Sequence, residues 1–257
     1  MVSAFWIVRG SLRRRLHALI STCSKGLNEM LQDLAIYSAD NFSDMNIVSS
    51  FMGLKSLTIL SSNRYLQPGG GCAAPYDLPN LEELRLHGLT YLVNISELVG
   101  HLGLQFSKLK LIEVVRCPQM KCLLFYGNFI LSLPNLEAIK ISFCEKLDEL
   151  FNYTPDQTLG VEPVAPNLKT LELKNLPKLR SLCRPKESWP SLEQFYVVKC
   201  NLLSKLPLNI QNANTIKEIR GESQWWSGLK WDSHNTESAL KRFLVFPYLF
   251  LLQKRTL

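Results

Sequence analysis

Cysteine and histidine side chains are the groups in this sequence that could bind a metal ion or act as a catalytic nucleophile. The paired Cys-x-x-Cys spacing typical of zinc sites is missing, and no spacing pairs a cysteine with a histidine as nucleophile and base. The sequence therefore predicts neither a metal site nor an enzyme. The cysteines stand at positions 23, 72, 117, 122, 144, 183 and 200, and the histidines are His17, His87, His101 and His234.

A phosphate-binding loop is not expected either. Such a loop needs the string Gly-x-x-x-x-Gly-Lys followed by Ser or Thr, because backbone amides and the lysine surround the phosphates together. The sequence contains no such string, and the run of glycines at 69–71 lies between Pro68 and Pro75 without a lysine. That run is typical of a connection between elements. We therefore expect no cofactor.

Composition and charge narrow the class of protein further. The chain has 257 residues, is 46% hydrophobic and carries a formal net charge of +7. Its basic residues are spread out, with Arg13, Arg14 and Arg15 as the tight cluster, so a nucleic-acid partner is not expected. The apolar run 243–252 spans only about half of a bilayer, which predicts no membrane span. The odd number of cysteines and the lack of a secretory signal favour the cytoplasm.

A repeated pattern of apolar residues predicts the fold. The segments LPNLEELRLHGL, LPNLEAIKISFC and APNLKTLELKNL each place Leu, x, x, apolar, x, apolar after a Pro-Asn pair. The first apolar residue of each unit recurs after 23, 27, 28, 27, 32, 24 and 24 residues, mostly within the range of leucine-rich repeats. These first positions are Leu31, Leu54, Leu81, Leu109, Leu136, Leu168, Leu192 and Ile216.

The five units that begin between Leu81 and Leu192 share a longer register. Counted from the first leucine, offsets 0, 3, 5, 8, 11 and 14 are always apolar. Offsets 3 and 5 alternate as in a short strand, so offsets 2, 4 and 6 point to the other face. Offsets 8, 11 and 14 advance by three, the period of a tight helical turn or an irregular arc. The cysteines at offset 8 are predicted to be small core residues; they are Cys117, Cys144 and Cys200.

One such coil cannot bury its apolar edge alone, so successive coils must stack. We predict an α/β repeat solenoid, a leucine-rich-repeat horseshoe with a parallel sheet of about eight short strands on its concave face and mostly irregular or short helical convex segments. Its expected parts are an irregular or short helical segment over 1–24, the repeat domain over 25–222, and a C-terminal cap with an apolar tail over 223–257. Trp225, Trp226 and Trp231 are expected to cover the end of the core.

The outward strand positions form columns across neighbouring coils and are the predicted protein-binding surface. Their charges are mixed, which suits a protein partner, whereas a phosphate backbone favours a continuous cationic track. Arginine and tyrosine are enriched among residues that carry most of the binding energy at interfaces. For any single position the alternative is an ordinary solvated side chain. The predicted binding residues are Arg85, His87, Glu113, Lys140, Glu172, Lys174 and Tyr196.

Several strings resemble a known family. LPNLEELRLHGL, CPQMKCL, WPSLEQFYVVKC and IKEIRGESQWWSGLKWD are similar to the carboxy-terminal repeats of plant nucleotide-binding leucine-rich-repeat disease-resistance proteins of the coiled-coil class. The resemblance covers roughly residues 27–232. It implies an intracellular immune receptor whose repeats contribute to effector perception and hold a nucleotide-binding switch inactive. The matching residues include neither the coiled coil nor the nucleotide-binding region, so ATP binding is not carried over.

The resulting hypothesis is a cytoplasmic protein-binding module of plant immunity. Its expected partner is a pathogen effector, a guarded host protein or a nucleotide-binding receptor domain. The alternative is a leucine-rich-repeat adaptor outside immunity, such as the substrate receptor of a ubiquitin ligase. The sequence does not choose an oligomeric state.

Overall fold

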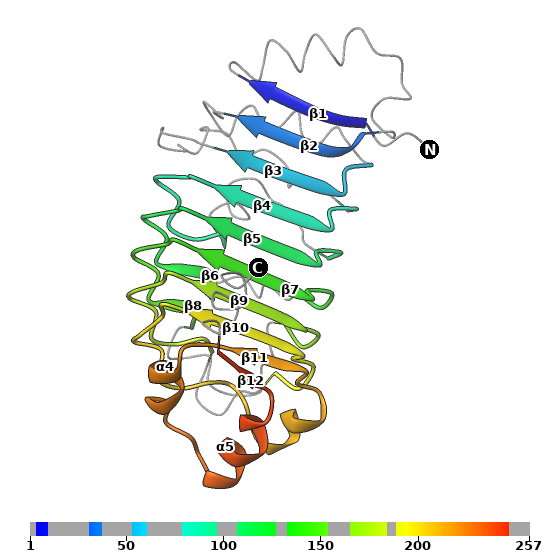
Figure 1. Ribbon diagram of the computed structural model, residues 1–257. Coiled ribbons are helices and arrows are strands. Elements are labelled where there is room, and N and C mark those ends of the chain that lie inside the picture. The colour runs from blue at the N-terminus through cyan, green and yellow to red at the C-terminus, as the bar shows by residue number, and fades with distance from the viewer. Residues whose placement is uncertain are drawn as a thin grey trace, which may run out of the picture.

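Strands that lie one beside the next form the framework of the described chain (Figure 1). The computed structural model describes residues 4–9, 31–37, 53–60, 79–96, 107–126, 133–153, 165–183 and 189–246. Ten strands form one parallel sheet in the order β1-β2-β3-β4-β5-β7-β9-β10-β11-β12. Their bounds are β1 Ala4–Arg9, β2 Leu31–Tyr37, β3 Ser56–Leu60, β4 Glu83–His87, β5 Leu111–Val115, β7 Ala138–Ser142, β9 Thr170–Lys174, β10 Gln194–Val198, β11 Glu218–Arg220 and β12 Leu244–Val245. The predicted leucine-rich-repeat solenoid is confirmed.

The strand register is the one that the repeat predicts. From β3 to β10 the residues at offset 3 lie opposite one another on adjacent strands, and each side chain is fully buried. The eight first positions, from Leu31 to Ile216, are also buried. Apolar side chains of successive coils therefore share one continuous interior. The residues at offset 3 are Leu57, Leu84, Ile112, Ile139, Leu171 and Phe195.

The Pro-Asn pairs are part of the turns that lead into the strands. The amide of Leu136 donates to the carbonyl of Leu133 at 3.1 Å, which closes a four-residue turn with proline at its second position. Proline suits that position because its φ angle is already fixed near the required value. The amide group of Asn135 then donates to the backbone oxygen of Ser107 at 2.6 Å, one coil earlier. Proline thus shapes the turn, and asparagine joins neighbouring coils.

A second turn explains the three-residue step from offset 8 to offset 11. The amide of Met120 donates to the carbonyl of Cys117 at 3.2 Å, and the same bond recurs in the next three coils. Two of the following segments form a small parallel sheet behind the main one, with β6 over Cys122–Tyr126 and β8 over Glu149–Tyr153 (Figure 1). These two convex segments are extended, within a convex side that the sequence predicted to be mostly irregular or short helical. A 3-10 helix, η2, spans Ile210–Asn214 in the last coil.

The sheet also extends further than predicted at both ends. β1 lies inside the segment 1–24, which was expected to be irregular or short helical, and it pairs with β2. The run Phe5 to Val8 is rich in aromatic and β-branched residues, which favour strands, but it lacks the repeat register. At the other end β12 adds to β11. Residues 1–3, 10–24 and 247–257, with most of the expected apolar tail, lie outside the described residues.

Tryptophans pack on the last coil of the core. The short helix α4 spans Ser223–Ser227 and buries Trp225 and Trp226, and α5 follows over His234–Lys241. The indole nitrogen of Trp225 donates to the carbonyl of Leu203 at 3.0 Å. Its ring meets the Phe195 ring edge-on, with 6.2 Å between centroids. None of the helices within the described ranges has the length and hydrophobicity that crossing a bilayer requires.

Asn212 in η2 provides a first test of this end of the molecule. Its side chain is buried, donates to the carbonyl of Trp189 at 2.9 Å and accepts from the amide of Asn209 at 2.9 Å. Asn212→Asp removes the donor and places a carboxylate against a carbonyl oxygen, which should lower the free energy of unfolding by about 2 to 3 kcal/mol. Urea denaturation at neutral pH measures this.

Asn209→Asp is the matched control for that change. Asn209 is exposed, and its side chain accepts a hydrogen bond from the amide of Gln211, which aspartate also accepts. The control should therefore change stability by less than about 0.5 kcal/mol. Equal losses for the two variants would show that the buried hydrogen bond of Asn212 is not the cause.

Candidate protein-binding surface

The centre of each concave strand carries the outward residue at offset 4. These residues are registered neighbours across six adjacent strands, and we refer to them as the central column. Acidic and basic side chains alternate along its first four positions, so each charge has an opposite charge on the next coil. The column consists of Arg85, Glu113, Lys140, Glu172, Tyr196 and Arg220.

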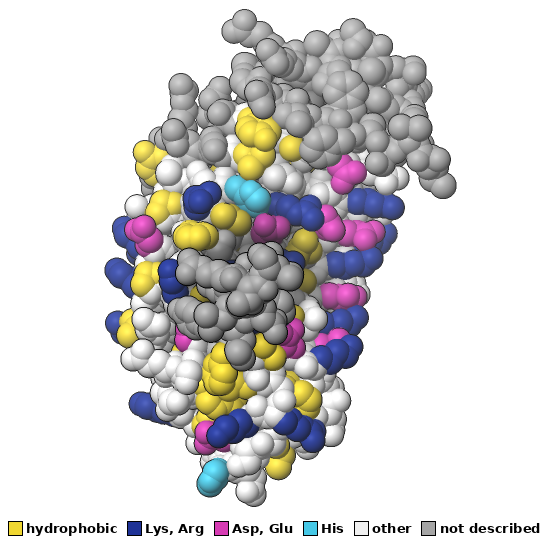
Figure 2. Space-filling view, viewed as in Figure 1, with side chains coloured by type: hydrophobic (Ala, Val, Ile, Leu, Met, Phe, Trp, Pro, Cys, Tyr) yellow, Lys and Arg dark blue, Asp and Glu magenta, His cyan; other side chains and the backbone are white. Residues whose placement is uncertain are grey.

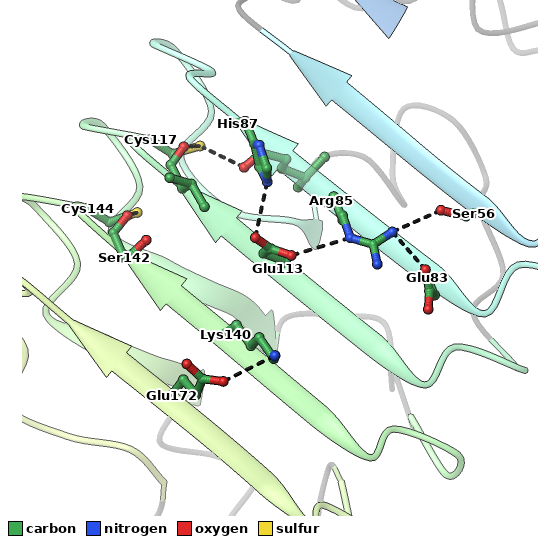
Figure 3. A network of polar contacts seen from close by, with 12 residues as sticks. Ser56, Glu83, Arg85, His87, Glu113, Cys117, Lys140, Ser142, Cys144 and Glu172 are labelled. Carbon is green, nitrogen blue, oxygen red and sulfur yellow. Dashed lines mark hydrogen bonds and ion pairs between the residues drawn. The ribbon is translucent and has the colours of Figure 1, made fainter. Parts of the chain in front are cut away.

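The Arg85 guanidinium is held from both sides of its strand (Figure 3). It lies 3.3 Å from a carboxylate oxygen of Glu113 and 2.7 Å from Glu83, and it donates to the Ser56 hydroxyl at 3.0 Å. His87 points at the other oxygen of Glu113 from 3.5 Å but makes no hydrogen bond to it. The imidazole and this carboxylate therefore form an ion pair only when His87 is protonated. Three side chains, Ser56, Glu83 and Glu113, thus fix the orientation of the arginine.

Glu172 is the acidic centre of the next group. Its carboxylate lies 3.1 Å from the ammonium of Lys140 and 2.6 Å from that of Lys174. Burial alone would raise the pKa of Glu172, but the two ammonium groups outweigh it and lower the pKa below its usual value. Glu172 therefore stays ionised and joins two coils of the sheet.

Tyr196 belongs to a third group, toward the C-terminal end. Its hydroxyl donates to Glu218 at 2.9 Å, and the Arg220 guanidinium lies over its ring, 4.9 Å from the centroid. Arg220 also pairs with Glu218 at 2.6 Å. Burial raises the pKa of the Tyr196 hydroxyl, and the hydrogen bond to Glu218 raises it further. An aromatic face, a cation and a carboxylate thus meet on the last coils.

The structure places all seven predicted binding residues on the concave strands β4 to β10. It brings them together in three groups, around Glu113, Glu172 and Tyr196. Four residues in these groups were not among the predicted ones, although they occupy outward positions of the same columns. Reading each column across coils, rather than each residue alone, would have found them. They are Ser56, Glu83, Glu218 and Arg220.

Charges also alternate at the edge where the strands begin. The residues at offset 1, which we call the edge ladder, pair across coils: Lys110 with Glu82 at 2.7 Å, for example. On the right of Figure 2 this edge appears as alternating dark blue and magenta. Such exposed pairs contribute less than about 1 kcal/mol each. The ladder consists of Lys55, Glu82, Lys110, Glu137, Lys169, Glu193 and Lys217.

The ion pairs of Glu172 predict a pH-dependent loss of stability. Glu172→Gln should cost about 1 kcal/mol at pH 7, because it removes the charge that both lysines contact. The folded-state pKa of Glu172 is lowered, so its contribution is present above the unfolded pKa of about 4.3 and disappears as pH falls through the folded pKa. Urea denaturation should therefore show the difference between wild type and variant shrinking toward zero below about pH 4.

Glu137→Gln is the control for this pH dependence. Glu137 contacts one lysine, Lys169 at 3.2 Å, and its side chain is 47% exposed. Its substitution should have a smaller effect at pH 7. If Glu172→Gln cost as much at pH 3 as at pH 7, the lysine contacts would not be the source of its contribution.

The cysteines at offset 8 are core residues, as predicted. Cys117, Cys144 and Cys200 are fully buried. Burial raises the pKa of Cys200 to about 12. The neighbouring thiol of Cys144, together with burial, also raises the pKa of Cys117. Neutral, buried thiols such as those of Cys117 and Cys200 are poor nucleophiles. In the described part of the chain, no three His, Cys, Asp or Glu side chains gather as metal ligands.

Stacked coils, a parallel concave sheet and buried repeat positions define a leucine-rich-repeat protein. Comparison with known families agrees. The chain belongs to the family described as plant disease resistance protein RPS2-like, leucine-rich repeats, whose sequence profile matches residues 80–217.

Individual relatives come from Arabidopsis thaliana. The chain is 39% identical over 203 residues to disease resistance protein At4g27190. This match covers 75% of this chain and 20% of the relative. It is 37% identical over 211 residues to probable disease resistance protein At4g27220, covering 81% of this chain and 22% of the relative. The chain thus spans about a fifth of the length of these relatives. No solved structure matches it significantly.

Proposed function

We propose that this chain is the protein-recognition part of a plant disease-resistance protein. In this proposal it acts in the cytoplasm by binding another protein on its concave face, and it catalyses no reaction. The observation that carries the proposal is the central column, which presents fixed charges and an aromatic ring on adjacent strands of a repeat surface from this family. Side chains that are already oriented lose little conformational entropy on binding.

The balance of charge on the concave face favours a protein partner over nucleic acid. Outward positions of β2 to β11 carry five acidic and four basic residues, although the whole chain has a net charge of +7. A phosphate backbone would need a continuous cationic track, and the central column interrupts each cation with a carboxylate. The charged residues counted are Asp33, Glu83, Glu113, Glu172, Glu218, Arg85, Lys140, Lys174 and Arg220.

The proposed partner is a pathogen effector, a guarded host protein or the nucleotide-binding part of a receptor. The last of these supplies a defined probe, because the chain matches only about a fifth of the relative At4g27190. We would co-express this chain in leaves with a form of that relative from which the matching segment is deleted. Immunoprecipitation of the tagged chain is expected to recover the deleted form.

Charge reversal on the central column tests where the contact lies. Lys140→Glu should reduce the recovered partner by about tenfold, because it places like charge beside Glu172 and removes a cation from the face. Lys169→Glu, the same reversal on the edge ladder, should change it by less than about twofold. Failure of the wild-type chain to recover the deleted relative would contradict the receptor-domain partner. Equal losses for both variants would contradict the concave face.

A further inference from the structure

The turns that follow the concave strands carry an excess of basic side chains. We call this surface the turn edge and define it by segments 116–122, 143–149, 175–181 and 199–205. These segments hold seven basic residues and three acidic ones, and all seven basic side chains are exposed. Figure 2 shows dark blue side chains at successive levels along the left edge. The basic residues are Arg116, Lys121, Lys146, Lys178, Arg180, Lys199 and Lys205.

Within the described residues, the side chains of these cations differ from those on the other two surfaces in forming no ion pair with a carboxylate, although the backbone amide of Lys199 donates to the Glu222 carboxylate at 3.0 Å. On the central column and edge ladder, Lys110, Lys140 and Lys169 each lie within 3.2 Å of a glutamate. Among the described residues, no cation of the turn edge forms such an ion pair. Adjacent uncompensated charges repel one another and favour an anionic partner.

Like charges are close neighbours on this edge. Lys146 donates to Gln119 at 2.6 Å, which shows that offset-10 side chains of adjacent coils are in contact. Lys178 occupies the same offset on the next coil, so its backbone lies about one strand spacing, roughly 5 Å, from that of Lys146. Two cations at this spacing match carboxylates on successive exposed residues of a bound chain.

The backbone of the turn edge is strained at charged and aromatic residues. Arg116, Phe143 and Lys199 have φ angles of 54°, 58° and 55°, in the left-handed region that is unfavourable for such residues. The equivalent positions of two other coils hold Gly88 and Asn175, which adopt this conformation more easily. The coil geometry therefore does not require Arg, Phe or Lys here, and strain of this kind clusters at binding sites.

Apolar side chains lie among the cations. Phe143 and Leu202 are each 46% exposed, although most large apolar residues of the described chain are buried. The Arg116 guanidinium lies 5.3 Å from the centroid of the Phe143 ring. A phosphate backbone offers nothing for these side chains to bury, whereas an acidic polypeptide with apolar residues contacts both kinds.

We propose that the turn edge binds an acidic protein segment that also carries apolar side chains. The segment runs along the stack of coils, its carboxylates meeting Lys146, Lys178 and Lys199 and its apolar residues meeting Phe143 and Leu202. This site is separate from the concave face and does not depend on the partner proposed there.

Fluorescence anisotropy with the full chain tests the proposal. The probe is a labelled peptide of about twelve alternating Glu and Phe residues, with single-stranded DNA of equal charge as comparison. We expect saturable peptide binding, and we expect Lys146→Glu with Lys178→Glu to raise the Kd at least about tenfold. Lys169→Glu with Lys217→Glu makes the same charge change on the edge ladder and should raise the Kd less than about threefold. If the double variant Lys146→Glu with Lys178→Glu does not fold, the double variant Lys146→Gln with Lys178→Gln is used in its place.

A variant that relieves strain distinguishes binding from stability. Lys199→Gly removes a cation and suits the left-handed φ, so we expect weaker peptide binding with a Tm lowered by no more than about 1 °C. Tighter binding of DNA than of peptide, equal effects of the two double variants, or no saturable peptide binding would each overturn the proposal.

Discussion

Leu171→Ala is expected to lower the free energy of unfolding by about 2 to 5 kcal/mol and to remove the cooperative thermal transition. Leu171 is fully buried and lies opposite Ile139 and Phe195 on the neighbouring strands. Its removal leaves a cavity between coils, and each coil of a solenoid is stabilised mainly by its neighbours. Circular dichroism during heating and urea denaturation measures the loss. Ile139→Ala and Leu84→Ala should behave alike, because they occupy the same offset.

Thr170→Ala is the control on the same strand. Thr170 is partly exposed on the outward side, and its hydroxyl donates to Gln194 at 3.3 Å. Its loss should cost less than about 1 kcal/mol. An unchanged melting temperature for the three core variants, or a similar loss for Thr170→Ala, would contradict the inward and outward assignment of the strand.

Trp225→Ala should have the second large effect, about 3 to 5 kcal/mol. Trp225 packs against Phe195 in the last part of the core and donates to Leu203. Without it, apolar side chains of the final coils become exposed at the end of the stack. Urea denaturation of the full chain is the measurement.

Gly221 provides a coupled test of the same packing. A Cβ atom on Gly221 would lie 2.4 Å from the Trp225 ring, so Gly221→Ala should cost about 1 to 3 kcal/mol in the wild type. In the Trp225→Ala background the ring is gone, and the same substitution should be nearly neutral. Strictly additive effects would mean that the ring does not occupy the place of an inward side chain at this position.

Most of the fold could be predicted from the spacing of apolar residues. Successive side chains of a strand alternate between the two faces of the sheet, so offsets 3 and 5 share the inward face, and a shift by one residue would expose residues such as Leu84 and Leu86. That constraint fixed the strand register before the structure was known, and it placed Glu113 and Lys140 on the same face. The cysteines at offset 8 followed from the same pattern, because leucines fill that offset in other coils.

Other features depend on contacts that the pattern does not contain. β1 and β12 join the sheet by strand pairing outside the repeat register, so no repeated leucine marks them. The choice among possible ion pairs depends on side-chain reach: Glu172 contacts both Lys140 and Lys174, while Tyr196 contacts Glu218. The edge ladder is visible in the sequence once the register is known. The left-handed backbone conformation at offset 7 cannot be predicted in the same way, because only glycine and asparagine indicate that conformation in a sequence.

The fold and the proposed surfaces are connected by this one register. Inward residues are apolar on every coil, so variation between coils is confined to outward positions and turns. The charges of the central column form ion pairs, whereas among the described residues the side-chain cations of the turn edge form none. The chain therefore has two surfaces of different chemistry on one rigid stack.

A crystal structure of the chain tests the stacking of coils most directly. We expect Leu84, Ile112, Ile139, Leu171 and Phe195 to lie side by side on adjacent parallel strands with buried side chains, and Arg85, Glu113, Lys140 and Glu172 to line the opposite face. A register shifted by one residue, or antiparallel pairing of these segments, would contradict the account.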